Sequence, residues 1–342
     1  MNIPSDAPSD AKTISARTAR RARDDHGAPP RWMAVTAGGV LAVAWAGTAM
    51  AQALPAASQV KLAPHRAIYE MKLGDSRSGS GVTDLSGRMV FEITGSACEG
   101  YTQNMRFVME TSNRDGASST TDMRSSSWED GAAARYRFTV SNYRDQEQTD
   151  ATSGNALRSG APASAAAPGK AADKSTDNGA GGGAGGGAGE VKVELTKPQA
   201  TTLNLPGKVV FPVQHSRMLI DAATAGQSLL EADLYDGSEK GEKVYATTAV
   251  LGKAIKTEPV SIAAKVKNAE KLTGLSSWPV SISYFDKSKE KEDSLPVYEI
   301  AFRYFANGVS ENLVIDYGDF SIQGSLKEIE FYDMPKCEPE KK

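Results

Sequence analysis

Apolar and polar residues alternate with a period of two along most of the chain after residue 63. A β-strand produces this pattern because successive side chains point to opposite faces of its sheet. Turn signals such as Gly74-Asp75-Ser76 and Asn307-Gly308 separate the runs. The alternating positions are Ala67, Tyr69, Met71 and Leu73; Met105, Phe107 and Met109; Tyr245, Thr247, Ala249 and Leu251; Val280, Ile282 and Tyr284; Tyr298, Ile300, Phe302 and Tyr304; and Leu313, Ile315 and Tyr317. The pattern predicts an antiparallel β protein whose sheet has one solvated face.

The number of predicted strands limits the architecture. So many successive strands must curl into a barrel, a sandwich or a form between the two. One segment departs from the pattern and predicts a helix around 212–225, because Pro212 can begin a helix and Gly226 can end one. Between them, apolar residues recur at helical spacing at Met218, Leu219, Ala222 and Ala223. We expect the apolar face of this helix to plug the curved sheet, and a shorter helix to form around 263–272.

Residues 146–190 differ in composition from the rest of the chain. They are mostly Ala, Gly, Ser and Asp, and end in a glycine-rich run at 181–189. Such a segment buries too little apolar surface to offset its ordering entropy, which predicts disorder. Strand patterns at 136–140 and 191–195 resemble the two arms of a hairpin with a stretched turn. Doubling the length of a loop raises the free energy of closing it by only about 0.6 kcal/mol. We therefore favour a loop insertion in one domain, 52–342, over an interdomain linker.

The first 51 residues have the organisation of an export signal. Arginines such as Arg17 and Arg31 precede an apolar run at 32–51 that ends in Thr-Ala-Met-Ala. Cleavage is predicted after Ala51, or alternatively after Ala53. A retained membrane anchor is the other interpretation, since the run approaches the ~20 residues needed to span a bilayer. Its many alanines and glycines favour the signal peptide, which leaves no transmembrane segment after cleavage.

The two cysteines are Cys98 and Cys337. In an exported chain, a lone pair of cysteines predicts one structural disulfide, here clasping the two ends of a single domain. Removing residues 1–51 takes away six Lys/Arg and four Asp/Glu, so the formal net charge changes from −3 to −5. This mildly acidic balance predicts no broad binding surface for nucleic acid or anionic lipid.

Candidate catalytic residues do not converge. Gly74-Asp75-Ser76 resembles the nucleophile turn of a lipase or esterase, but no histidine follows His215, so the general base is missing near the C-terminus. His65 and His215 have no Cys or His at metal-ligand spacing, which argues against zinc. We therefore predict a turn at Ser76, a packed or capping role for His215, no catalytic residue, no metal site and no cofactor.

Two further groups have a structural and a functional interpretation. Asp316 and Asp319 flank Gly318 and either form a carboxylate pair or shape a turn; the turn is favoured. In the segment 135–144, basic and aromatic residues interleave, a spacing found in surfaces that stack single-stranded nucleic acid. The residues are Arg135, Tyr136, Arg137, Phe138, Tyr143 and Arg144. For an exported acidic protein, a strand with one solvated face is the preferred interpretation.

Several segments in order resemble the EipB-type cell-envelope integrity proteins. They are Phe211-Pro212 with His215, Tyr235-Asp236-Gly237-Ser238, Trp278-Pro279-Val280 with 283–286, residues 307–320, and residues 333–337. The resemblance runs from about Ala63 to Cys337. It implies a periplasmic protein of Gram-negative bacteria folded as a β-spiral, a long bent antiparallel sheet that curls around a helix without closing.

The resemblance also implies an internal disulfide at Cys98 and Cys337, a role in envelope integrity and stress resistance, and a tetratricopeptide-repeat protein as partner. It implies no enzymatic activity. The insertion at 146–190 departs from the family pattern. Three functions follow in order of preference: a non-enzymatic scaffold or adaptor that binds a periplasmic protein, a carrier of a lipid or other apolar ligand in the concave face, and an envelope hydrolase. Neither the ligand nor the oligomeric state can be predicted from the sequence.

Overall fold

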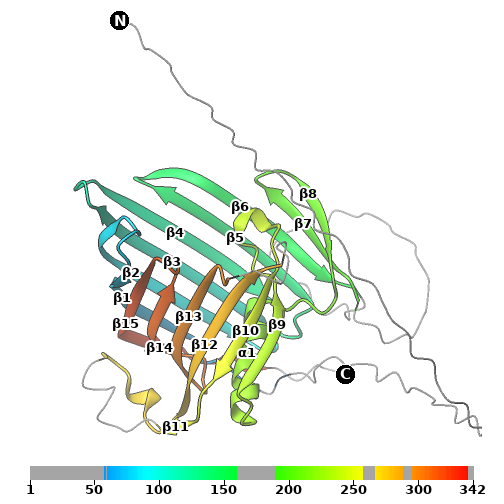
Figure 1. Ribbon diagram of the computed structural model, residues 1–342. Helices are drawn as coiled ribbons and strands as arrows, with labels where there is room; N and C mark the ends of the chain where they lie inside the picture. Colours follow the sequence, from blue (N-terminus) through cyan, green and yellow to red (C-terminus); the bar gives the residue numbers. More distant parts are fainter. Residues whose placement is uncertain (1–57, 59, 160–188, 257–265, 288–294, 338–342) are drawn as a thin grey trace, which may run out of the picture. The chain divides into compact units, whose positions relative to one another are not determined.

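The computed structural model describes residue 58 and residues 60–159, 189–256, 266–287 and 295–337, all within the compact unit Ala51–Lys342. The predicted signal peptide and residues 160–188 of the predicted insertion lie outside the described residues. Among the described residues, fifteen antiparallel strands form one sheet in the order β8-β7-β6-β5-β4-β3-β2-β1-β15-β14-β13-β12-β10-β9, with β11 beside β12 (Figure 1). Their bounds are β1 (His65–Ser76), β2 (Val82–Ser96), β3 (Gly100–Asn113), β4 (Ser118–Glu129), β5 (Arg135–Arg144), β6 (Glu147–Arg158), β7 (Val191–Lys197), β8 (Thr201–Leu205), β9 (Leu229–Leu234), β10 (Tyr245–Leu251), β11 (Ile255–Lys256), β12 (Ser276–Asp286), β13 (Tyr298–Phe305), β14 (Ser310–Asp316) and β15 (Phe320–Phe331). The predicted antiparallel β fold is confirmed.

The sheet curls but does not close. Its first and last strands in the chain, β1 and β15, pair with each other, so the two terminal strands of the sheet are β8 and β9. The end of the sheet that contains β5–β7 turns back toward the segments on either side of β9. Tyr136 of β5 donates its hydroxyl to the carbonyl of Asp236 at 2.9 Å, and its ring stacks on Phe211 with centroids 5.2 Å apart. Aromatic packing therefore holds β5–β7 over the chain that enters the helix.

Helix α1 (Pro212–Thr224) lies beside β9 and β10 and confirms the predicted helix (Figure 1). It ends where Gly226 adopts φ 75°, and the Gln227 N–H donates to the Ala222 carbonyl at 2.9 Å. Glycine adopts this left-handed conformation without the steric cost that other residues meet. The buried face of α1 joins an apolar cluster with β9, β10, β12 and β13 through Val213, Leu219, Ile220 and Ala222. The helix therefore fills the concave side of the sheet, as predicted.

A second cluster lies where β1, β2, β14 and β15 meet. Val266, Ala269 and Leu272 pack into it. The helix predicted around 263–272 is wrong over the described part of that range: only a 3₁₀ turn, η2 (Glu270–Leu272), forms there. The Lys267 N–H donates to the Lys327 carbonyl of β15 at 2.9 Å, so this segment follows a strand edge instead of coiling.

The prediction for the loop insertion is wrong at its start, because strand β6 occupies residues 147–158. β6 pairs with both β5 and β7, so the two predicted hairpin arms are not neighbours. The inward positions of β6 carry small residues, and at Gly154 a Cβ atom would lie 2.9 Å from Leu195 and 3.0 Å from Phe138. The bulky side chains on the strands next to β6 fill the space, so the strand lacks the apolar bulk by which the sequence pattern identifies strands.

The predicted disulfide is present. Cys98 lies in the turn between β2 and β3, and Cys337 follows β15, with their Cα atoms 5.8 Å apart. β1 is the strand between β2 and β15. The bridge therefore joins strands near the middle of the sheet and touches neither terminal strand, β8 nor β9. The bridge joins an early and a late part of the domain, as predicted, but it does not hold the open ends of the curled sheet, because the terminal strands β8 and β9 lie in the middle of the sequence.

Candidate functional site

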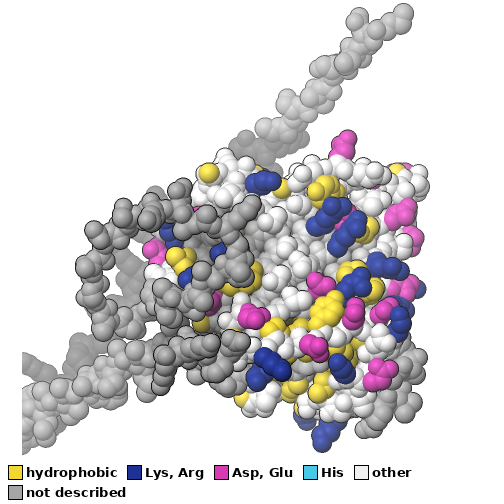
Figure 2. Space-filling view, turned by 180° about the vertical axis from the view of Figure 1, so that it is seen from behind, with side chains coloured by type: hydrophobic (Ala, Val, Ile, Leu, Met, Phe, Trp, Pro, Cys, Tyr) yellow, Lys and Arg dark blue, Asp and Glu magenta, His cyan; other side chains and the backbone are white. Residues whose placement is uncertain are grey.

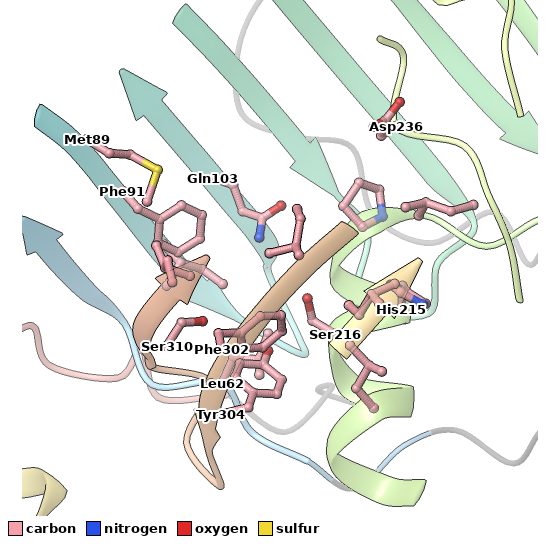
Figure 3. A pocket seen from close by; sticks show the side chains of 18 of the residues that line it. Leu62, Met89, Phe91, Gln103, His215, Ser216, Asp236, Phe302, Tyr304 and Ser310 are labelled. Carbon is pink, nitrogen blue, oxygen red and sulfur yellow. The ribbon is translucent and has the colours of Figure 1, made fainter. Parts of the chain in front are cut away.

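A cavity of about 350 Å³ lies between α1 and the inward faces of β1–β3 and β12–β14 (Figure 3). Most of its walls are apolar and aromatic. Met89 and Phe91 form one side, Phe302 and Tyr304 come from β13, and α1 contributes Ser216 and His215. Its size falls at the lower end of the range for small-molecule sites, about 300–1,000 Å³. The cavity is therefore large enough to hold a small ligand.

The strand register explains why these side chains meet. His65 of β1 stands opposite Ile93 of β2, and Ile93 stands opposite Gln103 of β3. Directly paired residues of antiparallel strands point to the same face, so the three side chains form one inward row. Two residues further along β1, the register places Ala67 opposite Phe91. The alternating pattern in the sequence thus produces a continuous inner wall.

His65 is almost completely buried, with 1% of its surface exposed. Its Nδ1 donates to the Ala63 carbonyl at 2.7 Å, since a carbonyl oxygen can only accept. Burial lowers the pKa of the imidazole, although the hydrogen bond to Ala63 opposes this shift. In the neutral ring, Nε2 is an acceptor, and it has no hydrogen-bond partner among the described residues. The alternating pattern did not predict that His65 is buried, because this residue stands just before the first predicted alternating run.

His215 has a packing role in this structure. Its Nε2 lies 3.3 Å from the Thr247 hydroxyl, and that hydroxyl donates its only proton to the Ala232 carbonyl at 3.0 Å. The imidazole must therefore donate to Thr247. Burial lowers the pKa of His215 to about 4, so the ring is neutral at pH 7. A packed histidine was the favoured sequence interpretation, and these contacts agree with it.

Two buried tyrosines, Tyr69 and Tyr304, form part of the cavity wall. The Tyr69 hydroxyl donates to the Ser310 carbonyl at 2.8 Å, which links β1 to β14. Burial raises the pKa of Tyr304 to about 12, and a hydrogen bond from Ser216 opposes this effect. Both phenols are therefore neutral at physiological pH. They act as fixed parts of the wall and not as acid or base groups.

Glu129, at the end of β4, is a structural residue that the sequence analysis missed. Its two carboxyl oxygens accept the N–H groups of Val213 and Gln214, each at 2.7 Å, and so cap α1 from a distant part of the chain. Burial raises the pKa of Glu129 to about 8, against the opposing effect of these two hydrogen bonds. One signal was present in the sequence: Phe211 precedes the helix and cannot cap it, so the first N–H groups of α1 needed a distant acceptor.

The remaining sequence candidates do not form a catalytic or binding group. The turn predicted at Gly74-Asp75-Ser76 is wrong, because β1 runs through Ser76 and the chain turns after it, at residues 78–79. The Ser76 hydroxyl bonds to Ser80 at 2.8 Å and donates to the Val82 carbonyl at 2.8 Å, so it is held by the β1–β2 connection. Asp316 accepts the Gly318 N–H at 2.7 Å, and no contact joins it to Asp319.

The basic and aromatic residues of β5 divide between its two faces. Tyr136 and Phe138 are buried in the core, whereas Arg137 lies outside over Trp128, 5.4 Å from the ring centroid. They therefore do not make one stacking surface. From behind, the molecule shows Lys and Arg interspersed with Asp and Glu over a largely polar face (Figure 2). No basic stripe is visible on that face.

Two kinds of feature are absent from the described residues. None of the helices in that part of the chain is both long and apolar enough to span a bilayer. Likewise, these residues contain no group of three or more His, Cys, Asp or Glu side chains that could bind a metal ion.

Comparison with known proteins gives a consistent result. The EipB-like family model matches residues 56–177 and 169–333. The cell envelope integrity protein EipB of Brucella abortus (strain 2308) is 36% identical over 307 residues, which cover 89% of this chain and 96% of that protein. A crystal structure titled a β-barrel-like protein of domain of unknown function DUF1849, also from Brucella abortus, has a TM-score of 0.66 and 34% identity. That similarity covers 80% of this chain and all of the other.

The Brucella abortus EipB protein is described as an envelope integrity protein and not as an enzyme. This homology supports a role for the present chain in the integrity of the cell envelope. The open antiparallel sheet, the single helix and the sequence similarity over most of the chain agree with one another. The chain belongs to the EipB-like family.

Proposed function

We propose that this chain is a non-enzymatic adaptor that maintains the cell envelope by binding another periplasmic protein at a free edge of its sheet. The observation that carries this proposal is the position of β8. It is a terminal strand, and no second strand pairs with it among the described residues. A terminal strand presents unpaired backbone N–H and C=O groups to which another chain can add.

The other terminal strand, β9, is less suited to this role. The Val210 N–H donates to the Asp233 carbonyl at 2.8 Å, and the Tyr235 N–H donates to the Val210 carbonyl at 2.9 Å. The chain entering α1 therefore already occupies part of the β9 edge. β8 also contains no charged residue and no proline, the residue types that commonly protect strand edges from pairing.

The proposed partner is a tetratricopeptide-repeat protein of the periplasm. Such proteins stack helical repeats into solenoids with extended concave surfaces, and these surfaces can accept an exposed extended segment. Thr202 and Asn204 of β8 are exposed and would face such a surface. The resemblance to EipB-type proteins suggests this class of partner, and the free strand suggests where it binds.

Site-specific crosslinking in cells tests the proposal. A photo-crosslinking amino acid at Asn204 on β8 should capture a periplasmic protein, whereas one at Thr139 on the central strand β5 should not. The double variant Thr202→Lys/Asn204→Lys should abolish capture and envelope function together, since it places charges at the two exposed side-chain positions of β8 that would face the partner. The control Thr120→Lys/Thr139→Lys adds the same charge to exposed positions of central strands. Equal loss in both variants, or capture from Thr139 alone, would contradict the proposal.

The periplasmic location is part of the same proposal. The predicted signal peptide, 1–51, should be absent from the mature protein. Mass spectrometry of the protein recovered from the periplasmic fraction should then give an N-terminus at Gln52, or at Leu54 if cleavage follows Ala53. A chain retained in the membrane with residues 1–51 intact would favour the anchor interpretation.

A second candidate function is a carrier of an apolar ligand. It is supported by the cavity of about 350 Å³ lined mainly by apolar and aromatic side chains. The two functions use different parts of the molecule, because the cavity lies between α1 and β1–β3 with β12–β14, whereas β8 ends the sheet.

A further inference from the structure

We propose that the cavity between α1 and the curled sheet binds a neutral saccharide, whose hydroxyl groups are held by Gln103, Tyr284 and Tyr298. This inference goes beyond the adaptor function and does not depend on it, because the cavity and β8 are different parts of the molecule. It also gives the cavity a different ligand from the apolar molecule of the carrier function. Its support comes from the free polar groups of the wall, from the charge of the wall and from its aromatic rings.

Three side chains of the cavity wall carry polar groups that are not paired within the protein. The amide of Gln103 and the hydroxyls of Tyr284 and Tyr298 have no hydrogen-bond partner among the described residues. They are also not among the polar atoms that are both unpartnered and sealed from solvent, as Nε2 of His65 is. The cavity itself is partly open to solvent. A ligand that enters it can therefore reach these three groups.

The three groups come from two walls of the cavity. Gln103 extends its amide from β3 into the cavity, between Phe91 and Ser216 in the view of Figure 3. Tyr284 of β12 stands opposite Tyr298 of β13, and their rings stack with centroids 4.4 Å apart. The two phenols therefore form one pair, and a ligand between β3 and this pair meets polar groups on two sides.

These groups favour a ligand that both donates and accepts hydrogen bonds. The Gln103 amide offers two N–H donors and an acceptor oxygen, and each phenol offers one O–H donor and accepting lone pairs. A hydrocarbon would bury these groups without partners, which is unfavourable. An ammonium group has no lone pair, so it would leave the amide N–H groups without an acceptor. Hydroxyl groups meet both needs, because each donates one proton and accepts others.

The charge of the wall favours an uncharged ligand. Among the described residues, no Lys or Arg lines the cavity, so a carboxylate or phosphate has no cation to pair with there. A buried charge without a partner is strongly unfavourable. Asp236 is the one acidic residue of the wall, and its carboxylate already accepts the Ser238 N–H at 2.9 Å. Burial raises the pKa of Asp236, which weakens its attraction for a cation.

Aromatic rings supply the apolar contacts that a saccharide needs. Phe91 of β2 and Phe302 of β13 line the cavity and are only partly buried (Figure 3). A pyranose ring presents C–H groups on its faces, and their partial positive charge suits the negative face of an aromatic ring. One sugar ring can therefore contact phenyl rings with its faces while the hydroxyls at its edge reach the polar side chains.

The position and size of the cavity distinguish a saccharide from a peptide. Extended peptides commonly bind by pairing with a free strand, but β1–β3 and β12–β14 each have a neighbouring strand on both sides. The cavity, at about 350 Å³, lies at the lower end of the range for small-molecule sites. It therefore has room for a small saccharide, and its open part allows a longer saccharide or a lipid-linked sugar to continue into solvent.

NMR and calorimetric titration of the oxidised protein with a panel of sugars test the proposal. The panel contains the methyl glycosides of glucose, galactose, mannose and N-acetylglucosamine. Three matched compounds accompany the best of these: 2-methoxytetrahydropyran, which keeps the ring without the hydroxyls, and the amino sugar and uronic acid of the same configuration, which carry a charge. We expect the neutral glycoside to bind at least about tenfold more tightly than each of the three. 1-Decanol tests the apolar carrier in the same assay.

A matched pair of variants tests the tyrosine hydroxyls. Tyr284→Phe/Tyr298→Phe keeps both rings and should weaken binding of the glycoside about tenfold. The control Tyr245→Phe removes a hydroxyl that donates to Glu239 at 2.8 Å. Tyr245 contacts the same two rings but does not line the cavity, so this variant should keep the wild-type affinity. In the wild type, the ¹H–¹⁵N signals of the Gln103 side chain should shift when the glycoside is added, a measurement that needs no substitution.

Each outcome decides one part of the argument. If none of the four glycosides binds at about 10 mM, the saccharide is refuted, and binding of 1-decanol alone assigns the cavity to the apolar carrier. If a charged sugar or the ring without hydroxyls binds as tightly as the glycoside, the neutral, hydroxyl-directed site is wrong. Equal losses in the double variant and in Tyr245→Phe, or unchanged Gln103 signals, would refute the assigned side chains.

The source of the sugar and the adaptor function are separate questions in this design. The hexyl glycoside of the best sugar compares a lipid-linked sugar with a free one. A gain of more than about tenfold over the methyl glycoside supports a lipid-linked sugar in the site, whereas equal affinity supports a free saccharide. Capture at β8 is measured by crosslinking, so failure of the saccharide leaves the adaptor function standing, and failure of capture leaves the saccharide standing.

Discussion

Replacing both cysteines by serine tests what the disulfide contributes to this fold. Cys98 lies at the β2–β3 turn and Cys337 lies six residues beyond β15, so the bridge is near the start of β1, where His65 pairs with Ile93 and Phe331. β15 is also held there by other bonds. The Tyr332 N–H donates to the Pro64 carbonyl at 2.9 Å, and its hydroxyl donates to the Glu92 carboxylate at 3.0 Å. Without the bridge, the native sheet should therefore keep its register up to Tyr332.

The main effect should then act on the unfolded chain. The cysteines are 239 positions apart, and the chain-entropy model for a loop of that length gives about 5 kcal/mol, while native disulfides usually contribute about 2–4 kcal/mol. We expect Cys98→Ser/Cys337→Ser to lower the free energy of unfolding by about 3 kcal/mol. For a domain of this size, that loss corresponds to a decrease in Tm of roughly 10 °C.

Two measurements check this reasoning. Urea unfolding and calorimetry compare the double variant with the oxidised and the reduced wild type, which should behave like the variant after reduction. Native-state hydrogen exchange then reports local opening of the terminal strands. We expect exchange in β8 and β9 to be unchanged, because the bridge is attached to neither strand. Equal melting of the oxidised and reduced forms would refute the entropic account, and loosened β8 or β9 strands would refute the placement of the bridge at the centre of the sheet.

Three further predictions concern single residues. Glu129→Ala leaves two N–H groups of α1 unpaired, one buried and one partly buried, and should cost about 3 kcal/mol in urea unfolding, whereas Glu110→Ala, at an exposed position of β3, should cost under ~0.5 kcal/mol; similar losses would contradict the capping role. The pKa of His215 is lowered to about 4, so its contribution to stability is present above pH 6.5 and lost as the pH falls toward 4. Unfolding curves across that range should show a loss of about 3 kcal/mol that is absent from His215→Gln. Gly154→Val places a Cβ atom 2.9 Å from both the Glu194 carbonyl and Leu195 and 3.0 Å from Phe138, and should lower the free energy of unfolding by about 1–3 kcal/mol; an unchanged free energy would contradict the close packing at this position.

The sequence was sufficient to predict the strands that carry large side chains at their inward positions. Tyr69 and Met71 of β1 and Ile282 and Tyr284 of β12 produce a clear alternation and are buried as that alternation predicts. β6 was missed because its inward residues are small, and the bulk that covers them belongs to the strands beside it. A pattern read along one strand contains no information about the side chains of another.

The same limit applies to contacts that join distant segments. The pairing of Cys98 with Cys337 could be predicted because no other pair exists, but its place in the sheet depends on β1 pairing with β15. Glu129 and α1 are separated by more than 80 residues, so only the absence of a local cap hinted at their contact. The cavity is a further case, since its wall combines seven strands with the helix.

The two proposed binding activities can be separated genetically because they depend on different residues. Thr202→Lys/Asn204→Lys alters the edge of β8 and leaves the cavity untouched, while Ile300→Trp, at a position that lines the cavity, fills it and leaves β8 untouched. If envelope integrity fails only in the first variant, the protein acts as an adaptor whose cavity is incidental to that role. If it fails in both, the adaptor and its ligand act together. A route for such coupling exists, because Asp236 lines the cavity and its carbonyl accepts the hydroxyl of Tyr136 on β5, three strands from the β8 edge.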